Sequence, residues 1–233
     1  MNQARKRTTM QKVLSMILVL VMLLSLMSMS AFTMATNETG ASSSARNDFM
    51  RVFHLDCGRK YFSVAEIKSL IDTASAANYT HIELAVGNDS LRFLLDDMSV
   101  TVDGKTYASD DVKTQIHNGN VKYYDAGSVN ELSQSDMDAI IAYAQSKNIS
   151  IIPLINTPGH MDAILSAATS LTGVNCSAYD SVRTIDVANT TAVAFTQALL
   201  QKYINYFAGK GCGYFNMGAD CLLYTSPSPR DRG

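Results

Sequence analysis

The sequence places chemically capable polar residues beside short apolar segments that have the length of strands. These residues are Arg51, Asp56, Arg59, Asp89, His160 and Asp220. Carboxylates and a guanidinium group can each bind paired hydroxyl groups, and a histidine can join a proton network. Such a set suits a neutral ligand rich in hydroxyl groups, such as a sugar.

Part of this set also has a purely structural interpretation. We favour an ion pair between Asp56 and Arg59 over contact of either residue with a ligand. His160 follows Pro-Gly, and a capped turn explains it as well as a ligand contact does. The neighbouring Asp96 and Asp97 lack histidines or further carboxylates at metal-ligand spacing, so no metal site or other cofactor is predicted.

The segments that must position these residues alternate between strand and helix patterns. Ser63-Val-Ala-Glu66 has the capping-box pattern of a helix start, and Ser133-Gln-Ser-Asp136 opens a second helix. A third helix is predicted over Thr190–Tyr206, where apolar residues recur at helical spacing. Strands are predicted over four apolar segments, namely Arg51–Asp56, Thr80–Val86, Ile149–Ile155 and the short buried Tyr214–Met217. Pro153 counts against a central strand, but its apolar flanks outweigh it.

A long connection runs from Gly87 to about Asn130. Within it, Val100–Tyr107 predicts a hairpin that turns at Asp103-Gly104. A connection of this length inside a compact domain is usually functional. A decorative surface insertion explains it nearly as well, so both interpretations stay open.

The alternation predicts an α/β fold with parallel strands, either an open sheet or a barrel. An open nucleotide-binding sheet normally has a glycine-rich phosphate loop after its first strand, and the sequence contains no such motif. We therefore expect a (β/α)8 TIM barrel. Because such a barrel needs eight strands and this chain supplies four, we expect it to be truncated after about the fourth strand, with a partial barrel over residues 49–220.

Both ends of the chain differ in character from this domain. Basic residues precede the apolar run Val13–Met29, and small residues at 31–35 could be cleaved, so residues 1–35 predict a signal peptide. An uncleaved membrane anchor is the alternative. Residues 36–48 are predicted to form a linker. Residues 221–233, which contain a Ser-Pro-Ser-Pro run, are predicted to be an artefactual tail. We expect a secreted or extracytoplasmic protein without membrane contact after cleavage; its net charge of −2 favours no nucleic-acid partner.

Three motifs, in the same order and at roughly the same spacing, resemble those of one enzyme family. Arg51-Val-Phe-His-Leu-Asp56-Cys-Gly-Arg59, the turn Thr-Pro-Gly-His160 and the segment Met-Gly-Ala-Asp220 are similar to glycoside hydrolase family 20, the β-N-acetylhexosaminidases and lacto-N-biosidases. The resemblance implies exo-hydrolysis of terminal β-linked N-acetylhexosamine on a glycan or oligosaccharide, without a cofactor. A non-catalytic, secreted carbohydrate-binding barrel is the alternative. A chitinase is disfavoured because the Asp-x-x-Asp-x-Asp-x-Glu signature is absent.

The resemblance also implies roles for single residues in a substrate-assisted retaining mechanism. Asp220 matches the catalytic aspartate that orients the substrate's acetamido group. Arg51 matches a substrate-binding arginine, and His160 the histidine behind the general acid/base. Asp89 falls only approximately on a family carboxylate. Cys221 occupies the position of the acid/base glutamate, so we expect the chain as printed to be inactive.

Overall fold

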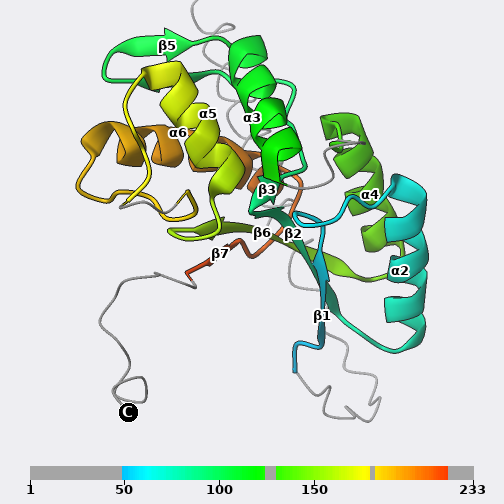
Figure 1. Ribbon diagram of the computed structural model, residues 1–233. Helices are drawn as coiled ribbons and strands as arrows, with labels where there is room; N and C mark the ends of the chain where they lie inside the picture. The colour runs from blue at the N-terminus through cyan, green and yellow to red at the C-terminus, as the bar shows by residue number, and fades with distance from the viewer. Residues whose placement is uncertain (1–48, 124–129, 179–181, 220–233) are drawn as a thin grey trace, which may run out of the picture. The chain divides into compact units, whose positions relative to one another are not determined.

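The computed structural model describes residues 49–123, 130–178 and 182–219. Strands and helices alternate through these ranges (Figure 1), which confirms the predicted α/β class. In chain order, the elements are β1 (Val52–Asp56), α2 (Val64–Ala76), β2 (His81–Asn88), β3 (Ser90–Leu91), β4 (Val100–Val102), β5 (Lys105–Tyr107), α3 (Ser109–Tyr123), α4 (Gln134–Ser146), β6 (Ser150–Thr157), α5 (Asp162–Thr172), α6 (Thr190–Gly209) and β7 (Asn216–Gly218).

Four of the strands form one parallel sheet in the order β1-β2-β6-β7. The short β3 turns back and pairs antiparallel with the end of β2. Pro153 lies inside β6, opposite Leu84 of β2, so the strand predicted across this proline is confirmed. Because the four strands run in the same direction, their carboxyl ends lie along one edge of the sheet.

One face of the sheet packs against helices and is strongly apolar. Ile82 and Leu84 of β2 and Ile151 and Ile155 of β6 belong to the buried core, together with apolar residues of α2, α4 and α6. Two of the helices, α2 and α4, begin with a capping box, in which a serine and an acidic side chain bond to each other's backbone N–H groups. The predicted starts at Ser63 and Ser133 are therefore confirmed.

The opposite face of the sheet carries a polar layer. His54 of β1 pairs with Glu83 of β2, with 2.7 Å between Nδ1 and Oε2. Asn216 of β7 donates to the other oxygen of Glu83 at 2.6 Å. A side chain from each of three strands thus joins one hydrogen-bonded group, which we call the polar layer.

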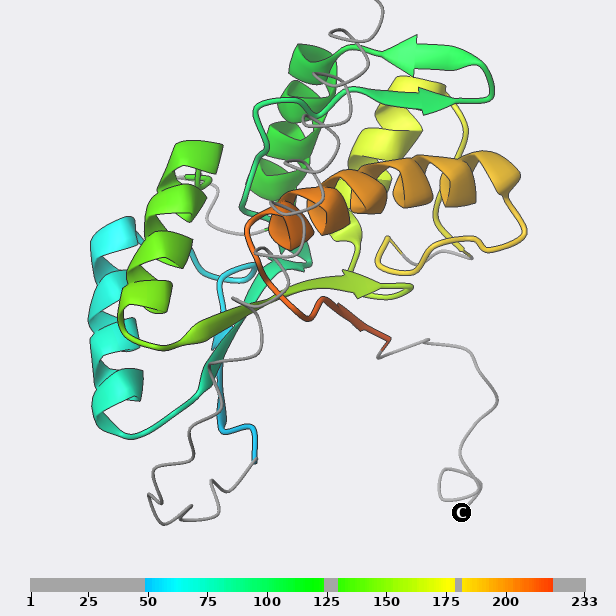
Figure 2. The ribbon, with the colours of Figure 1, turned by 180° about the vertical axis from the view of Figure 1, so that it is seen from behind.

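The long connection between β2 and β6 is packed into the domain. Its described part contains the predicted β4–β5 hairpin, with Asp103 and Gly104 at positive φ, and also the helix α3, which the sequence did not predict. Phe93 is buried against Tyr203 and Phe207 of α6, and α6 also contacts the hairpin (Figure 2). A decorative surface insertion is therefore excluded for this part of the connection.

Helix α3 approaches the start of α5 very closely. A Cβ atom on Gly119 of α3 would lie 2.8 Å from the Cα atom and 2.9 Å from the carbonyl oxygen of Ala163. Real side chains do not tolerate such distances, so a glycine at 119 permits the contact. The backbone of α3 consequently rests on the first turn of α5.

The prediction of a buried final strand is wrong in part. The strand is Asn216–Gly218, and Tyr214 and Met217 are 57% and 44% exposed. The reason is that β7 has only β6 as a neighbour among the described residues, so one side of it is uncovered.

Several predicted segments lie outside the described residues. These are the signal peptide over 1–35, the linker over 36–48, Asp220, and the tail over 221–233. Within the described ranges, no helix combines the length and the apolar character needed to cross a bilayer.

Candidate active site

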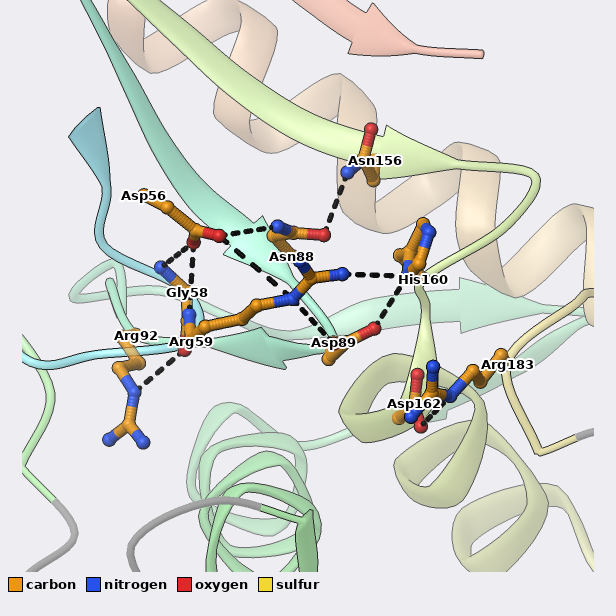
Figure 3. A network of polar contacts seen from close by, with 10 residues as sticks. All are labelled: Asp56, Gly58, Arg59, Asn88, Asp89, Arg92, Asn156, His160, Asp162 and Arg183. Carbon is orange, nitrogen blue, oxygen red and sulfur yellow. Dashed lines mark hydrogen bonds and ion pairs between the residues drawn. The ribbon is translucent and has the colours of Figure 1, made fainter. Parts of the chain in front are cut away.

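The carboxyl ends of three neighbouring strands are joined by side-chain hydrogen bonds (Figure 3). Asn88 of β2 donates from Nδ2 to Oδ2 of Asp56 at the end of β1, at 2.7 Å. Asn156 of β6 donates in turn to the side-chain oxygen of Asn88, at 2.9 Å. The relative positions of the strand ends are therefore held by side chains as well as by the sheet.

The fourth strand approaches this chain of hydrogen bonds through a glycine. Gly218 has a φ of 71°, and a Cβ atom there would lie 1.5 Å from Oδ1 of Asn156. Two independent constraints, the backbone conformation and the space available, therefore require glycine at the end of β7.

We expect Gly218→Ala to lower the free energy of unfolding by more than the matched variant Gly104→Ala. Gly104 has a φ of 77° but no heavy atom within 4 Å of the added Cβ, so its variant reports backbone strain alone. Strain of this kind is worth about 1–3 kcal/mol, and the collision with Asn156 adds to it. Urea denaturation of the chain and its two variants measures the difference. Equal losses would show that the space around Gly218 is not limiting.

The loop after β1 is anchored to the end of β2. Oδ1 of Asp56 accepts hydrogen bonds from the backbone N–H groups of Gly58 and Arg59, at 3.1 and 3.0 Å. A Cβ atom on Gly58 would lie 2.5 Å from the backbone nitrogen of Asn88, so the loop lies directly on β2. The buried Arg92 donates from Nε to the Gly58 carbonyl at 2.8 Å. These contacts place Arg59 across the end of β2.

Asp89 occupies the tight turn between β2 and β3. Its φ is 62°, a conformation that residues other than glycine adopt rarely and often at functional sites. Its N–H group donates to the His160 carbonyl at 2.7 Å, and its own carbonyl accepts from the Ala163 N–H at 2.9 Å. The backbone of Asp89 therefore holds the loop between β6 and α5 in place.

The Asp89 carboxylate binds both a guanidinium group and an imidazole ring. Oδ2 accepts from Nε of Arg59 at 2.9 Å, and Oδ1 lies 2.7 Å from Nδ1 of His160. An ionised carboxylate only accepts hydrogen bonds, so Nδ1 of His160 carries a proton. Nη2 of Arg59 lies 3.3 Å from the same Nδ1 atom. Because Nη2 and the protonated Nδ1 are both donors, this distance is a close approach and not a hydrogen bond. In the neutral ring, the lone pair is consequently on Nε2.

The three residues differ in exposure in a way that suits ligand binding. The side chain of Asp89 is 0% exposed, that of His160 13% and that of Arg59 44%. A buried carboxylate thus orients a histidine and an arginine that reach the surface. Such a histidine can exchange a proton at Nε2, and the guanidinium group can bind hydroxyl oxygens.

The structure brings two of the predicted substrate-binding residues together, but not the third. Asp89 and His160 are in direct contact, whereas Arg51 precedes β1 and so lies at the other end of the strand. The Arg51 N–H donates to Oγ1 of Thr80 at 2.9 Å, and its side chain donates to the Asn78 carbonyl. Asp220 lies outside the described residues.

Arg59 has a larger part in the site than the sequence suggested. The predicted ion pair with Asp56 is present, with Nε and Oδ2 3.9 Å apart. The contact with Asp89 is shorter by a full ångström. No short-range pattern relates positions 59 and 89, because the packing of two loops creates this pairing.

Asp162 was not singled out from the sequence. It is the first residue of α5, its side chain is 1% exposed, and Oδ1 lies 3.5 Å from Nε of Arg183. Burial and then the charge of Asp89 raise its pKa to about 6, against the lowering effect of Arg183. Its position two residues after His160 was the available signal.

A family profile described as "Glycosyl hydrolase family 20, catalytic domain" matches residues 49–225. This match covers most of the chain. The chain belongs to glycosyl hydrolase family 20. The predicted resemblance to that family is confirmed, and the match includes Asp220 and continues to residue 225.

Solved structures of family 20 include two of the pneumococcal virulence factor StrH, an exo-β-D-N-acetylglucosaminidase with tandem catalytic modules. The first StrH structure is 47% identical to the present chain and superposes with a TM-score of 0.71. The match covers 73% of the present chain and 42% of the StrH chain. The second StrH structure is 48% identical, with a TM-score of 0.70, and the match covers 72% of the present chain and 42% of the StrH chain. The chain therefore spans less than half the length of these relatives.

A curated relative is similar over a shorter range. Lacto-N-biosidase of Bifidobacterium bifidum is 31% identical over 88 residues, which are 38% of this chain and 8% of that protein. β-N-Acetylhexosaminidase of Bacteroides fragilis shares the fold at 23% identity, with a TM-score of 0.56. The first likeness agrees with membership of family 20, and the second shows a shared fold alone.

Proposed function

We propose that this chain belongs to an exo-acting glycosidase that removes terminal β-linked N-acetylhexosamine from glycans. The observation that carries the proposal is the cluster of Arg59, Asp89 and His160 at the carboxyl edge of the parallel sheet. In barrels of alternating strands and helices, catalytic groups lie at this edge. The high identity to StrH, an exo-β-D-N-acetylglucosaminidase, supports the same substrate class.

We also propose that the sheet is part of a (β/α)8 barrel in a secreted protein. Within the described ranges the helices pack on one face of the sheet, and the polar layer of His54, Glu83 and Asn216 lies on the face that a barrel would enclose. Residues 1–35 act as the signal peptide in this proposal.

The proposed reaction is substrate-assisted hydrolysis with retention of configuration. The acetamido oxygen of the substrate attacks the anomeric carbon and forms an oxazolinium-like intermediate. The bond to the leaving oxygen breaks, and that oxygen receives a proton from a carboxylic acid. Water then opens the intermediate and returns a proton to the same carboxylate. Asp220 orients the acetamido N–H and stabilises the positive charge of the intermediate.

His160 and Asp89 serve the proton-transfer step. Asp89 is fully buried and keeps the proton on Nδ1 of His160, so Nε2 of the neutral ring is the acceptor. We assign His160 to contact with the carboxylic acid that protonates the leaving group. In that position, the pair stabilises the acid/base group as it loses and regains its proton.

We assign hydroxyl binding to Arg59 instead of Arg51. Arg59 lies beside Asp89 and His160, and its side chain is nearly half exposed. Its Nε is held by Asp89, which orients the guanidinium plane. Arg51 precedes β1, where its N–H donates to Thr80 and its side chain donates to the Asn78 carbonyl.

A matched pair of variants tests this assignment in a complete catalytic domain that contains this segment. Arg59→Lys keeps the charge beside Asp89 but loses the planar donor pair, so we expect KM for p-nitrophenyl N-acetyl-β-glucosaminide to rise about tenfold or more. Arg51→Lys should leave KM and kcat unchanged. A larger effect at Arg51 would restore the assignment made from sequence. Absence of nitrophenol release by the unmodified enzyme would refute the proposed function itself.

A non-catalytic sugar-binding protein remains the second candidate function. The specific observation in its favour is Cys221, which follows Asp220 where the resemblance expects a glutamate. A thiol cannot replace a carboxylic acid as a proton donor to a sugar oxygen. A protein of this kind would bind N-acetylglucosamine in calorimetry and release no nitrophenol.

A further inference from the structure

Asp162 is a buried carboxyl group that the proposed reaction does not use. Oδ1 lies 3.5 Å from Nε of Arg183. Among the residues that the structure describes, no donor lies within hydrogen-bonding distance of Oδ2. A buried, ionised carboxylate oxygen without a donor is unfavourable. Protonation of Oδ2 removes this cost, because the neutral carboxyl group can then donate a hydrogen bond to a nearby acceptor.

The acceptor is Asp89, which the backbone holds next to Asp162. The Ala163 N–H donates to the Asp89 carbonyl at 2.9 Å, and the Met161 N–H donates to the Arg183 carbonyl at 3.0 Å. These bonds fix both neighbours of Asp162 in the chain. After burial, the charge of Asp89 also raises the pKa of the Asp162 carboxyl group, which agrees with two carboxyl groups lying near each other. Figure 3 shows Asp162 below the pair formed by Asp89 and His160, with Arg183 beside it.

The surrounding charges decide which of the two carboxyl groups keeps the proton. Asp89 faces Arg59 from the loop after β1 and His160 from the loop before α5, both within 3 Å. Asp162 forms its one ion pair among the described residues with Arg183, from the segment before α6, at the longer distance of 3.5 Å. Asp89 therefore holds the negative charge, and the proton resides on Asp162. The raised pKa of Asp162 agrees with this division.

We propose that Asp162 is a positioning residue, whose protonated carboxyl group donates a hydrogen bond to Asp89 and holds that carboxylate against His160 and Arg59. Loss of this proton puts two negative charges side by side and weakens the orientation of His160. The inference deepens the proposed function, because it concerns the same Asp89–His160 pair. Its first test needs no substrate, so its failure is distinguishable from failure of the proposed function.

The first test is 13C NMR of the side-chain carboxyl groups in the aspartate-labelled chain. We expect one carboxyl signal to titrate near pH 6, to disappear in Asp162→Asn and to remain in Asp97→Asn. Asp97 is a matched control because it is exposed and paired with Lys202. The inference is overturned if no carboxyl signal titrates above about pH 5, or if the signal near pH 6 survives in Asp162→Asn.

The second test separates positioning from a merely structural role, in a complete catalytic domain that contains this segment. Asp162→Asn keeps an N–H donor, so we expect kcat within about threefold of the unmodified enzyme at pH 5. The unmodified enzyme should lose activity as the pH rises through about 6, and Asp162→Asn should not. Asp162→Ala removes the donor and should lower kcat about tenfold. Equal losses in both variants, or an unchanged pH profile in Asp162→Asn, would contradict the positioning role.

Discussion

Asp220→Asn, in a complete catalytic domain that contains this segment, should lower kcat by about 10²–10³ and change KM little. The substitution keeps the size of the side chain and removes its charge. In the proposed reaction, that charge stabilises an oxazolinium group that develops only on the way to the transition state. Electrostatic stabilisation of this kind is worth about 10²–10³ per group, and its loss appears in kcat because the ground state is bound as before.

Steady-state kinetics with p-nitrophenyl N-acetyl-β-glucosaminide measures this effect. A thiazoline analogue of the intermediate should bind the unmodified enzyme far better than Asp220→Asn. Asp110→Asn is a suitable control, because Asp110 is exposed in the first turn of α3. Unchanged kcat and unchanged thiazoline affinity would make Asp220 a structural residue at a strand end.

We expect Asp89→Asn to lower kcat by about 10²–10⁴ through its effect on His160. The amide can place an N–H group where the carboxylate now accepts from Nδ1, which favours the wrong tautomer of the ring. General acid–base assistance contributes about 10²–10⁴ to a rate, and the same substitution in a catalytic triad has a cost of this order. The guanidinium group of Arg59 also loses its charged acceptor, so KM should rise as well.

The pH dependence of kcat separates this effect from a general loss of structure. Asp97→Asn is the control, because it makes the same aspartate-to-asparagine change at an ion pair on the surface. Circular dichroism should show the same helix content in both variants. A kcat for Asp89→Asn within threefold of the unmodified enzyme would remove Asp89 and His160 from proton transfer.

Local patterns in the sequence predicted the elements whose signals are local. The serine and acidic residue at Ser63 and Glu66 form the capping box that their spacing predicts. The hairpin turns at Asp103-Gly104, where both residues adopt positive φ. The apolar flanks of Pro153 correctly outweighed the proline, which lies inside β6.

The elements missed from the sequence are those whose identity depends on distant contacts. Helix α3 has only a short apolar stripe, with Val112 and Ile116 buried, and packs through a glycine and not through a large side chain. In the site, the sequence favoured Arg51 by its place in a motif. The pairing of Arg59 with Asp89 depends on how the loop after β1 lies on β2, and residue types alone do not determine that path.

The contact between Gly119 and Ala163 couples the long connection mechanically to the site. The long connection between β2 and β6 supports the first turn of α5, and that turn carries Asp162 and is bonded to Asp89. Any change that shifts α3 therefore also shifts the first turn of α5, and through the Ala163–Asp89 hydrogen bond it reaches the site.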